Sequence, residues 1–472
     1  MCVRTPTVEV RAHAGKRASR QVTQTPLRIM IRLTRSQVLP IGLDIGHDSI
    51  KMMQVETVGQ TLAVVACARQ VIPADVRDNP DQRRPAVADL VRQMFRNGRF
   101  VGRRVVVALP REMLHVKNLR MPLIPQHELA AAVKFEAKNI FAFDTDKAHI
   151  QILPAGEVRQ GVDVRQEVIV LAAQHDDVNG FLEQLHRSGA GVESIDVEAC
   201  ALYRAQERFI RRREDEQDVH VLVDVGCRRS AVVIGRGRDI SFVKGIDIGS
   251  HHFHDAVSRR LGITMDEARG LRRRLIEAAP GIAGADLMKK DAVRQAVFDA
   301  TRSTMEELGR EIGLCLRYYS VTFRGQRPGK LRLLGGEAAD PMLLGVLNAA
   351  LSIPVEAGRP LFSVDTSRME ATDRMGYMSE WALAFGLGLK LTTGTFAPRD
   401  GKPRDPSAPP APAAEVIDIA KAIENSTPID VIRRTDLPPS ANGLGNGNGG
   451  ANSTTTAAAG AAPAKRGEGV HA

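Results

Sequence analysis

The chain is poor in cysteine, in aromatic residues and in long apolar runs, and each shortage excludes a class of protein. Its cysteines are Cys2, Cys67, Cys200, Cys227 and Cys315. They are odd in number and scattered without CxxC or metal spacing, which indicates reduced thiols in a cytosolic protein. No stretch approaches 18 consecutive apolar residues, so nothing is expected to span a membrane and any membrane role must pass through a partner.

The net charge of +10 at first suggests a nucleic-acid partner, but its location argues against one. Residues 1–36 hold eight Lys and Arg against one acid, and residues 396–472 hold eight of each. Of the net +10, residues 1–36 account for +7 and residues 396–472 for zero, so residues 37–395 carry about +3. Such a net charge is ordinary for a soluble domain. With four tyrosines and one tryptophan in 472 residues, base stacking is also poorly supplied, so no nucleic-acid partner is expected.

The first 36 residues predict a basic, flexible leader without a folded role, because their apolar density is too low to offset the entropy of ordering. They lack the apolar centre of a secretory signal. Composition leaves an organellar transit peptide open, and Met30 is an alternative true start.

Hydrophobic periodicity indicates an α/β protein built from two similar blocks. The first opens with three strands, "LPIGLDIG", "KMMQVE" and "LAVVACARQ", and the second opens with "VHVLVDVG" and two further strands. Such self-similarity predicts two homologous halves. We expect a first lobe at 37–200 with a small α+β subdomain inserted at about 111–190, and a second lobe at 201–395. In the second lobe, Met305, Leu308, Ile312, Leu316 and Tyr319 fall on one predicted helix face.

Residues 396–472 shift to Pro, Ala, Gly, Asn and Ser, which is typical of a disordered tail or linker. Two short apolar islands interrupt it, "EVIDIAKAIE" at 415–424 and "TPIDVIRR" at 427–434. They are either docking motifs or, more simply, transient helices without a role.

The stretch "GLDIGHDSIK" at 42–51 has the composition of a phosphate-binding turn. Gly46 would let the turn bend tightly through a positive φ, Ser49 would add a hydroxyl donor, and Lys51 would add a cation. Asp44 at the strand end suits magnesium held through water. One such turn by itself is weak evidence.

Two further glycine turns strengthen the case. "DVGCRRS" supplies Asp224 and Gly226 in the second block, so two acid-bearing turns could hold the phosphates of one nucleotide and its magnesium between them. "LLGGEA" supplies Gly335 and Gly336, whose small size would let a base or ribose lie on the backbone.

These motifs, in this order, resemble the actin/hexokinase/sugar-kinase superfamily. Within it the chain is most similar to the type IV pilus assembly protein PilM family, relatives of the cell-division protein FtsA. The resemblance covers roughly residues 40–392 and also rests on "AVKFEAKNIFAF", "VESIDVEACALYRA", "DEARGLRR" and "ALAFGLGLK". It implies a two-lobed actin-like (ribonuclease H-like) fold with a nucleotide cleft between the lobes.

The resemblance also assigns roles to single residues. The phosphates would be faced by Gly46, Ser49, Lys51, Gly226 and Ser230, and the adenosine by Gly335 and Gly336. Asp44 and Asp224 would organise Mg²⁺, and Glu198 would position an attacking water. The family usually offers a glutamate and a lysine to the nucleotide where this chain has Arg269 and Arg272, and Glu267 is the candidate to compensate for the first exchange. Three other positions depart from the family. It prefers serine or asparagine at His47, threonine at Ser230 and glycine at Ser250.

Simpler explanations compete at three places. "HHFH" (His251, His252 and His254) fits exposed histidines at a helix start better than a zinc site, because no acidic or cysteine partner has suitable spacing. The run 272–274 is most simply a solvated helix face, with nucleotide contact by Arg272 as the alternative. Cys227 fits a small turn residue better than a nucleophile.

The resemblance implies a cytoplasmic ATP- and Mg²⁺-binding protein of pilus assembly, competence or secretion machinery. It would reach the inner membrane through partners by binding the short cytosolic tail of a PilN-like protein, and it would act with other pilus motor and assembly components. Hydrolysis would be slow at most. The alternatives are a small-molecule kinase with Asp196 as base, and an FtsA-like adaptor, against which the low-complexity C-terminus argues. Oligomeric state is left open, a homo-oligomer included, as is the process served.

Overall fold

The structure, a computed structural model, describes residues 36–59, 61–160, 163–277, 292–323, 327–374 and 376–392. The predicted leader (Ser36 apart) and the predicted tail at 396–472 lie outside the described residues, as do Met30 and Cys2. The two predicted α/β blocks fall within the described ranges.

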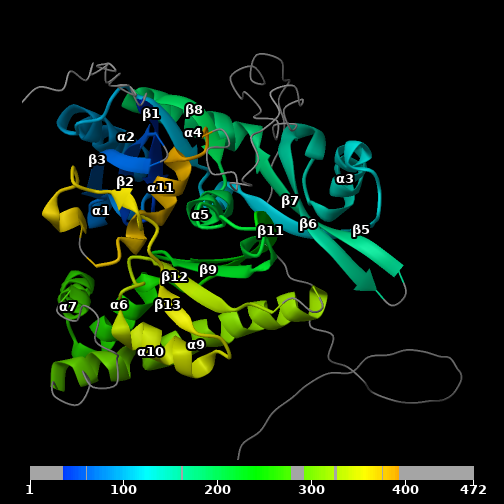
Figure 1. Cartoon of the computed structure of the whole chain (residues 1–472). Coiled ribbons are helices and arrows are strands. Elements are labelled where there is room, and N and C mark those ends of the chain that lie inside the picture. The colour runs from blue at the N-terminus through cyan, green and yellow to red at the C-terminus, as the bar shows by residue number, and fades with distance from the viewer. Residues whose placement is uncertain are drawn as a thin grey trace, which may run out of the picture. The chain divides into compact units, whose positions relative to one another are not determined.

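The first block forms a six-stranded sheet of order β14-β3-β2-β1-β4-β8 (Figure 1). Its strands are β1 (Ser36–Ile45), β2 (Ser49–Val58), β3 (Thr61–Val71), β4 (Arg104–Ala108), β8 (Gly191–Asp196) and β14 (Val364–Asp365). The first three pair antiparallel, and β4 and β8 continue the sheet in parallel. The predicted meander is confirmed, and its register sets Asp44 opposite Lys51.

The second block repeats this arrangement in a five-stranded sheet of order β11-β10-β9-β12-β13. Its strands are β9 (Val219–Val225), β10 (Ser230–Arg236), β11 (Asp239–Ile246), β12 (Lys330–Gly335) and β13 (Val355–Ala357). Here too the first three are antiparallel and the next two parallel. Leaving β14 aside, both sheets place the strands of their block in the order third, second, first, fourth, fifth. The repeat in sequence is therefore a repeat in structure.

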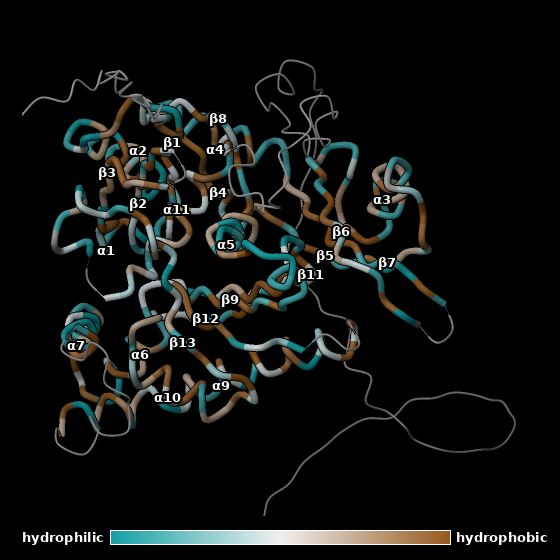
Figure 2. The backbone as a smooth tube through the Cα atoms, viewed as in Figure 1, coloured by the Kyte–Doolittle hydropathy of each residue, from teal (hydrophilic) through white to brown (hydrophobic). Residues whose placement is uncertain are grey.

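Helices bury the apolar surfaces of both sheets. On the first sheet these are α1 (Ala74–Arg77), α2 (Pro80–Asn97), α4 (His175–Ser188) and α11 (Ala382–Gly388). With the second sheet pack α5 (Glu198–Glu207), α6 (Ser250–Leu261), α7 (Met265–Glu277), α9 (Ala292–Thr322) and α10 (Pro341–Ala350). Figure 2 shows hydrophobic residues concentrated along β9 and β12, whereas α7 is largely hydrophilic.

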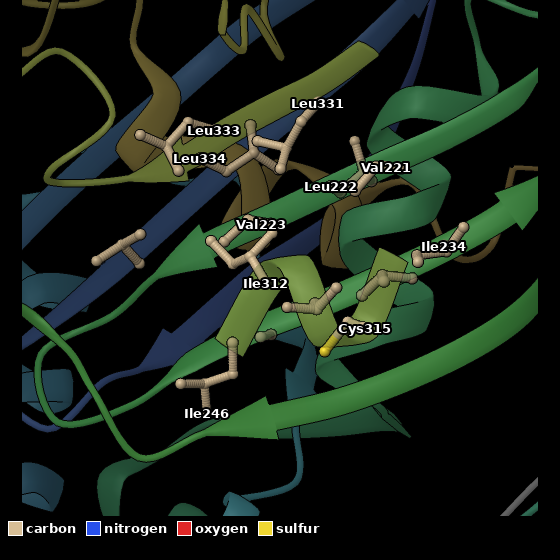
Figure 3. Packing of buried hydrophobic residues seen from close by; sticks show 14 of the residues in the cluster. Val221, Leu222, Val223, Ile234, Ile246, Ile312, Cys315, Leu331, Leu333 and Leu334 are labelled. Atoms are coloured by element: carbon tan, nitrogen blue, oxygen red, sulfur yellow. The ribbon is translucent and has the colours of Figure 1, made fainter. Parts of the chain in front are cut away.

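The core of the second block contains the predicted face of α9. All five of its residues are buried, and Ile312 and Cys315 belong to the same buried cluster as Val223 and Leu333 (Figure 3). The prediction of that face is confirmed.

The inserted subdomain is a three-stranded sheet of order β5-β7-β6 with one helix on its face. Its elements are β5 (His115–Pro122), α3 (Gln126–Ile140), β6 (Ala148–Gln160) and β7 (Asp163–Gln174). It ends with β7 rather than near residue 190, because Val178 and Phe181 of α4 belong to the apolar core of the first block.

The second lobe is not one contiguous segment, contrary to the predicted 201–395. β14 pairs with β3, and α11 packs on β1 so closely that a Cβ on Gly42 would lie 1.8 Å from the Ala384 carbonyl oxygen. Trp381 and Phe385 are completely buried in the cluster that covers this side of the first sheet. The chain therefore returns to the first block after β13. Among the described helices, none has the length and apolar character needed to cross a membrane.

Candidate functional site

Two glycine turns with the same geometry end the first strands of the two sheets. The Gly46 N–H donates to the Ser49 carbonyl at 3.0 Å, and the Gly226 N–H donates to the Arg229 carbonyl at 3.1 Å. An added Cβ would lie 3.0 Å from the same oxygen in the first turn and 2.8 Å in the second. Neither glycine has a positive φ, so that part of the prediction for Gly46 is wrong. Glycine is required because the backbone approaches itself too closely for a side chain.

Carboxylates from both halves, Asp44 buried and Asp224 half-buried, meet beside these turns. Asp44 of β1 pairs with Lys51 at 3.3 Å across the β1–β2 register. Burial, reinforced by the nearby Glu198 carboxylate and opposed by Arg111 and Lys51, raises the pKa of Asp224 to about 7. Asp44 also raises the pKa of Asp224, so the two aspartates lie within electrostatic reach of each other. The structure brings the two predicted acidic turns together.

Burial likewise raises the pKa of Asp44, opposed by Lys51 and reinforced by Glu198 and Glu380. For Lys51, burial favours the neutral amine, but Asp44, Glu380 and Asp224 hold its pKa above the ordinary value. Lys51 is therefore a charged ammonium that faces carboxylates of both halves.

Arg111 was not anticipated from the sequence, although it lies at the centre of the site. It begins a 3₁₀ turn, Arg111–Met113, directly after β4. Its guanidinium donates to both carboxylate oxygens of Glu198 and, at 3.2 Å, to the Ser230 carbonyl. The charge of Glu198 is thus balanced by the Arg111 guanidinium, which occupies both of its oxygens. Glu198 would have to leave Arg111 before it could position an attacking water.

The two predicted serines are not equivalent. Ser49 is buried at the start of β2 and its carbonyl closes the first turn. Ser230 is completely buried, and its hydroxyl, which the resemblance expects to face the phosphates, donates to the Ile248 carbonyl at 2.6 Å. The reason is register, because Arg229, not Ser230, holds the position in the second turn that Ser49 holds in the first.

Arginines surround the first turn and tie it to the second half. Arg228 of the second turn donates to the His47 imidazole at 2.8 Å and pairs with Asp78. Burial lowers the pKa of His47 to about 4, and the positive charge of Arg228 adds to this, so His47 is neutral and accepts the bond. Cys227 lies between Gly226 and Arg228, and burial raises the pKa of its thiol, as expected for a turn residue rather than a nucleophile.

Asp48, next in the first turn, is the meeting point of two more arginines. Arg77 approaches its carboxylate at 2.8 Å and Arg269 of α7 at 2.9 Å. Arg83 donates to the Gly46 carbonyl at 2.7 Å. Arg269 stands where the family usually offers a glutamate to the nucleotide, and here it forms an ion pair with Asp48 of the first turn.

The third glycine turn follows β12. Gly335 has φ +87°, and a Cβ there would lie 2.4 Å from the Val225 carbonyl oxygen, so it packs on the end of β9. A Cβ on Gly336 would meet no atom within 4 Å, so this glycine faces open space. Of the two predicted adenosine-facing glycines, Gly336 is the one with room for a ligand.

Arg272 is buried, so its assignment to a solvated helix face is wrong. Its side chain is 2% exposed, donates to Glu337 and Asp340 at 2.6 Å each, and lies over the Phe253 ring at 5.0 Å. It thereby fixes the loop that follows Gly335 and Gly336. Its neighbour Arg273 is exposed as expected.

Glu267 and the histidine run have structural partners. Glu267 accepts from the N–H and hydroxyl of Thr264 at 2.8 Å each, which caps the start of α7 and leaves the side chain at the surface. His254 is buried rather than exposed, 3.9 Å from Glu337, and burial lowers its pKa to about 3. Among the described residues no group of three or more His, Cys, Asp or Glu side chains could hold a metal directly.

Asp196, the base of the kinase alternative, is already engaged. It accepts from Arg204 at 2.8 Å and from the Val197 N–H at 2.8 Å, and Lys390 lies 3.4 Å away. These contacts belong to a network that fixes α5 and α11.

Comparison with known proteins agrees with this geometry. A family model described as type IV pilus assembly protein PilM matches residues 42–392. No curated protein matches the chain.

Three solved structures illustrate the similarity of the fold. A PilM-PilN type IV pilus biogenesis complex is 23% identical with a TM-score of 0.60, covering 74% of this chain and 97% of the other. EutJ of Carboxydothermus hydrogenoformans is 12% identical with a TM-score of 0.43, covering 75% and 89%. MreB5 of Spiroplasma citri bound to ADP is 13% identical with a TM-score of 0.38, covering 75% and 95%.

Proposed function

Since the chain belongs to the type IV pilus assembly protein PilM family and has its actin-like fold, we propose that it is an ATP-binding interaction platform of a pilus-type machine. The nucleotide binds between the two glycine turns, and the platform binds the short cytosolic tail of a PilN-like membrane protein. The observation that carries the nucleotide assignment is the meeting of Asp44, Asp224 and Glu198 beside the turns.

The charge of this cluster supports a cation. Three carboxylates face two cationic side chains, Lys51 and Arg111, and burial together with the Glu198 charge keeps the pKa of Asp224 raised despite those cations. Mg²⁺ prefers oxygen ligands and commonly takes one or two carboxylates with the phosphates of its nucleotide, so a three-carboxylate cage is not needed. Asp44 and Asp224 would hold it, directly or through water. When bound, the ion neutralises phosphate charge.

The chain's own residues would provide the remaining contacts. The Gly46 and Gly226 N–H groups already donate within their turns, so other backbone N–H groups of the two turns, together with the ammonium of Lys51, would face the phosphate oxygens. Gly336 leaves room for the nucleoside. Because Arg111 engages both oxygens of Glu198, we propose that hydrolysis is slow.

The nucleotide test uses two lysines that each pair with a buried aspartate. Lys51→Met removes the ammonium beside the turns, while Lys390→Met removes the one beside Asp196. Loss of a charge-assisted hydrogen bond corresponds to about ten- to hundredfold in affinity. We expect that weakening of binding to a fluorescent ATP analogue with Mg²⁺ for Lys51→Met alone. Equal affinity in both variants and in the unmodified chain would contradict the assignment.

The partner site is proposed at the inserted subdomain and the adjoining first block. Within the described sheet, β5 pairs only with β7, so its other edge offers main-chain hydrogen bonds to an extended peptide. Two large apolar side chains of this subdomain, Leu123 and Phe135, are 51% and 69% exposed.

A labelled peptide with the N-terminal tail sequence of a PilN-like protein tests this site. Phe135→Ser should weaken its binding to the full chain several-fold, because an apolar contact is lost. Leu314→Ser, on α9 and 52% exposed, is the matched control and should leave binding unchanged. Adding ATP and Mg²⁺ should change the affinity. If the peptide fails to bind both with and without nucleotide, the proposed binding of a PilN-like tail is refuted. The proposed nucleotide site is not affected by that result.

A further inference from the structure

A cavity of about 490 Å³ has no role in the functions described above. Residues from α5, β9, β12 and α10 line it, together with the segments at 356–362 and 377–382. Leu334, directly before Gly335, is among the lining residues, whereas no described residue of the turns at Gly46 and Gly226 lines the cavity. Its volume falls in the range of about 300–1,000 Å³ typical of ligand pockets.

Two hydrogen-bond donors in its wall lack partners within the described structure. Gln206 is 6% exposed and its Nε2 makes no hydrogen bond. The Nη1 of Arg332 is likewise buried without one, although its Nε lies 3.2 Å from Glu356. A buried donor without an acceptor is costly, so a ligand that brings oxygen acceptors would be favoured here.

The rest of the wall favours an acidic, apolar ligand. Phe209, Phe362 and Tyr377 provide aromatic surface, and the Arg359 guanidinium lies 4.6 Å from the centre of the Tyr377 ring. Among the described residues that line the cavity, Glu356 is the sole carboxylate, and the exposed Lys330 already approaches it at 2.9 Å.

Backbone strain is concentrated at the same wall. Among the described non-glycine residues, Ser363 and Met378 are those with positive φ, 61° and 54°, and each directly follows one of the aromatic residues, Phe362 and Tyr377. Such strain is costly and tends to cluster at functional sites.

The chain itself contains a segment of matching chemistry. Residues 415–424, "EVIDIAKAIE", carry three acids against one lysine, and Val416, Ile419 and Ile423 have the spacing of an apolar helix face. The second island, residues 427–434, has one acid against two arginines, which disfavours it beside Arg332 and Arg359.

The length of the linker is sufficient for contact. The described chain ends at Thr392, shortly after α11, and the first residue of α11, Ala382, lines the cavity. Twenty-two residues separate Thr392 from Glu415. A random coil of that length has a root-mean-square end-to-end distance of ~25 Å. The linker can therefore span back along α11, which has only seven residues, to the cavity at its first residue.

We propose that this cavity is a docking site for the chain's own segment Glu415–Glu424, whose acidic oxygens accept from Arg332 and Gln206 while its apolar face covers the aromatic wall. The inference does not depend on nucleotide or PilN-tail binding. It assigns the segment Glu415–Glu424 a role in covering this cavity.

The first experiment compares backbone amide exchange at 356–362 and 376–382 in two full-length triple variants. Val416→Ser, Ile419→Ser and Ile423→Ser remove the apolar face of the first island, and Ile429→Ser, Val431→Ser and Ile432→Ser do the same to the second. We expect several-fold faster exchange at the wall in the first variant and unchanged exchange in the second. Equal exchange in both and in the unmodified chain overturns the proposal.

The second experiment adds a labelled peptide of residues 413–426 to the full-length first-island variant. The affinity of the peptide for this variant should be at least about tenfold higher than its affinity for the unmodified chain, because the tethered segment of the unmodified chain competes for the cavity. Adding Arg332→Ala to the receptor should weaken binding about tenfold or more, and a peptide of residues 427–434 should not bind. If the 413–426 peptide does not bind, or if both peptides bind equally, the proposal that Glu415–Glu424 docks in this cavity is overturned.

Discussion

Replacing Asp224 by asparagine should stabilise the ligand-free chain near and above neutral pH. Its pKa is raised from 3.8 to about 7, mainly by burial and the Glu198 carboxylate. An acid with a raised folded-state pKa favours folding fully below its ordinary pKa, and this contribution is lost as pH rises through the folded value. Three pKa units set a ceiling of ~4 kcal/mol. Since Asp224 lies at a partly exposed turn, roughly 1–3 kcal/mol is expected.

Urea unfolding between pH 4.5 and 8.5 measures this effect. The free energy of unfolding of Asp224→Asn, less that of the unmodified chain, should be smallest at pH 4.5, which already lies above the ordinary pKa of 3.8, and should rise with pH until it levels off above about pH 7. Histidines such as His254, whose pKa is lowered, make both proteins more stable as pH rises. Subtracting the free energy of unfolding of the unmodified chain cancels that contribution. Asp215→Asn, at an exposed carboxylate whose pKa is lowered by backbone N–H bonds from Arg211 and Arg212, should show no such rise. A difference that stays flat or falls with pH would refute the account of the cluster.

Three further predictions concern the turns and their supports. Gly335→Ala should destabilise the fold by ~2 kcal/mol or more in urea unfolding, because its Cβ would meet the Val225 carbonyl, whereas Gly336→Ala should keep stability and weaken binding of an ATP analogue. Arg272→Met should lower the free energy of unfolding by ~3–5 kcal/mol, since it leaves two buried carboxylates unpaired. Arg228→Gln should speed nucleotide release in stopped-flow measurements with little change in stability, because its links between the halves are exposed; unchanged release would count against that role.

Features encoded locally could be predicted from the sequence. The strand meanders, the bounds of α3 and the buried face of α9 follow from periodicity over short windows. The two acidic turns could be paired because each ends the first strand of a repeated unit, and the sheets place those strand ends in matching positions.

Features that depend on long-range packing could not be predicted. The return of β14 and α11 to the first sheet and the assignment of α4 to it depend on contacts between distant segments. Arg111 gave no signal in "ALPRE", because its importance comes from Glu198, 87 residues away. Similarly, the burial of Arg272 requires Glu337 and Asp340 from another element, which a charged run alone does not reveal.

The most direct test of the central claim is a calorimetric titration of the full-length chain with ATP in excess Mg²⁺. The account predicts one ATP bound per chain, and at least about tenfold weaker binding when either half is altered, by Lys51→Met in the first or by Asp224→Asn in the second. Affinity that survives both changes, or the absence of any ATP binding by the unmodified chain, would contradict the claim that the two turns hold a single nucleotide.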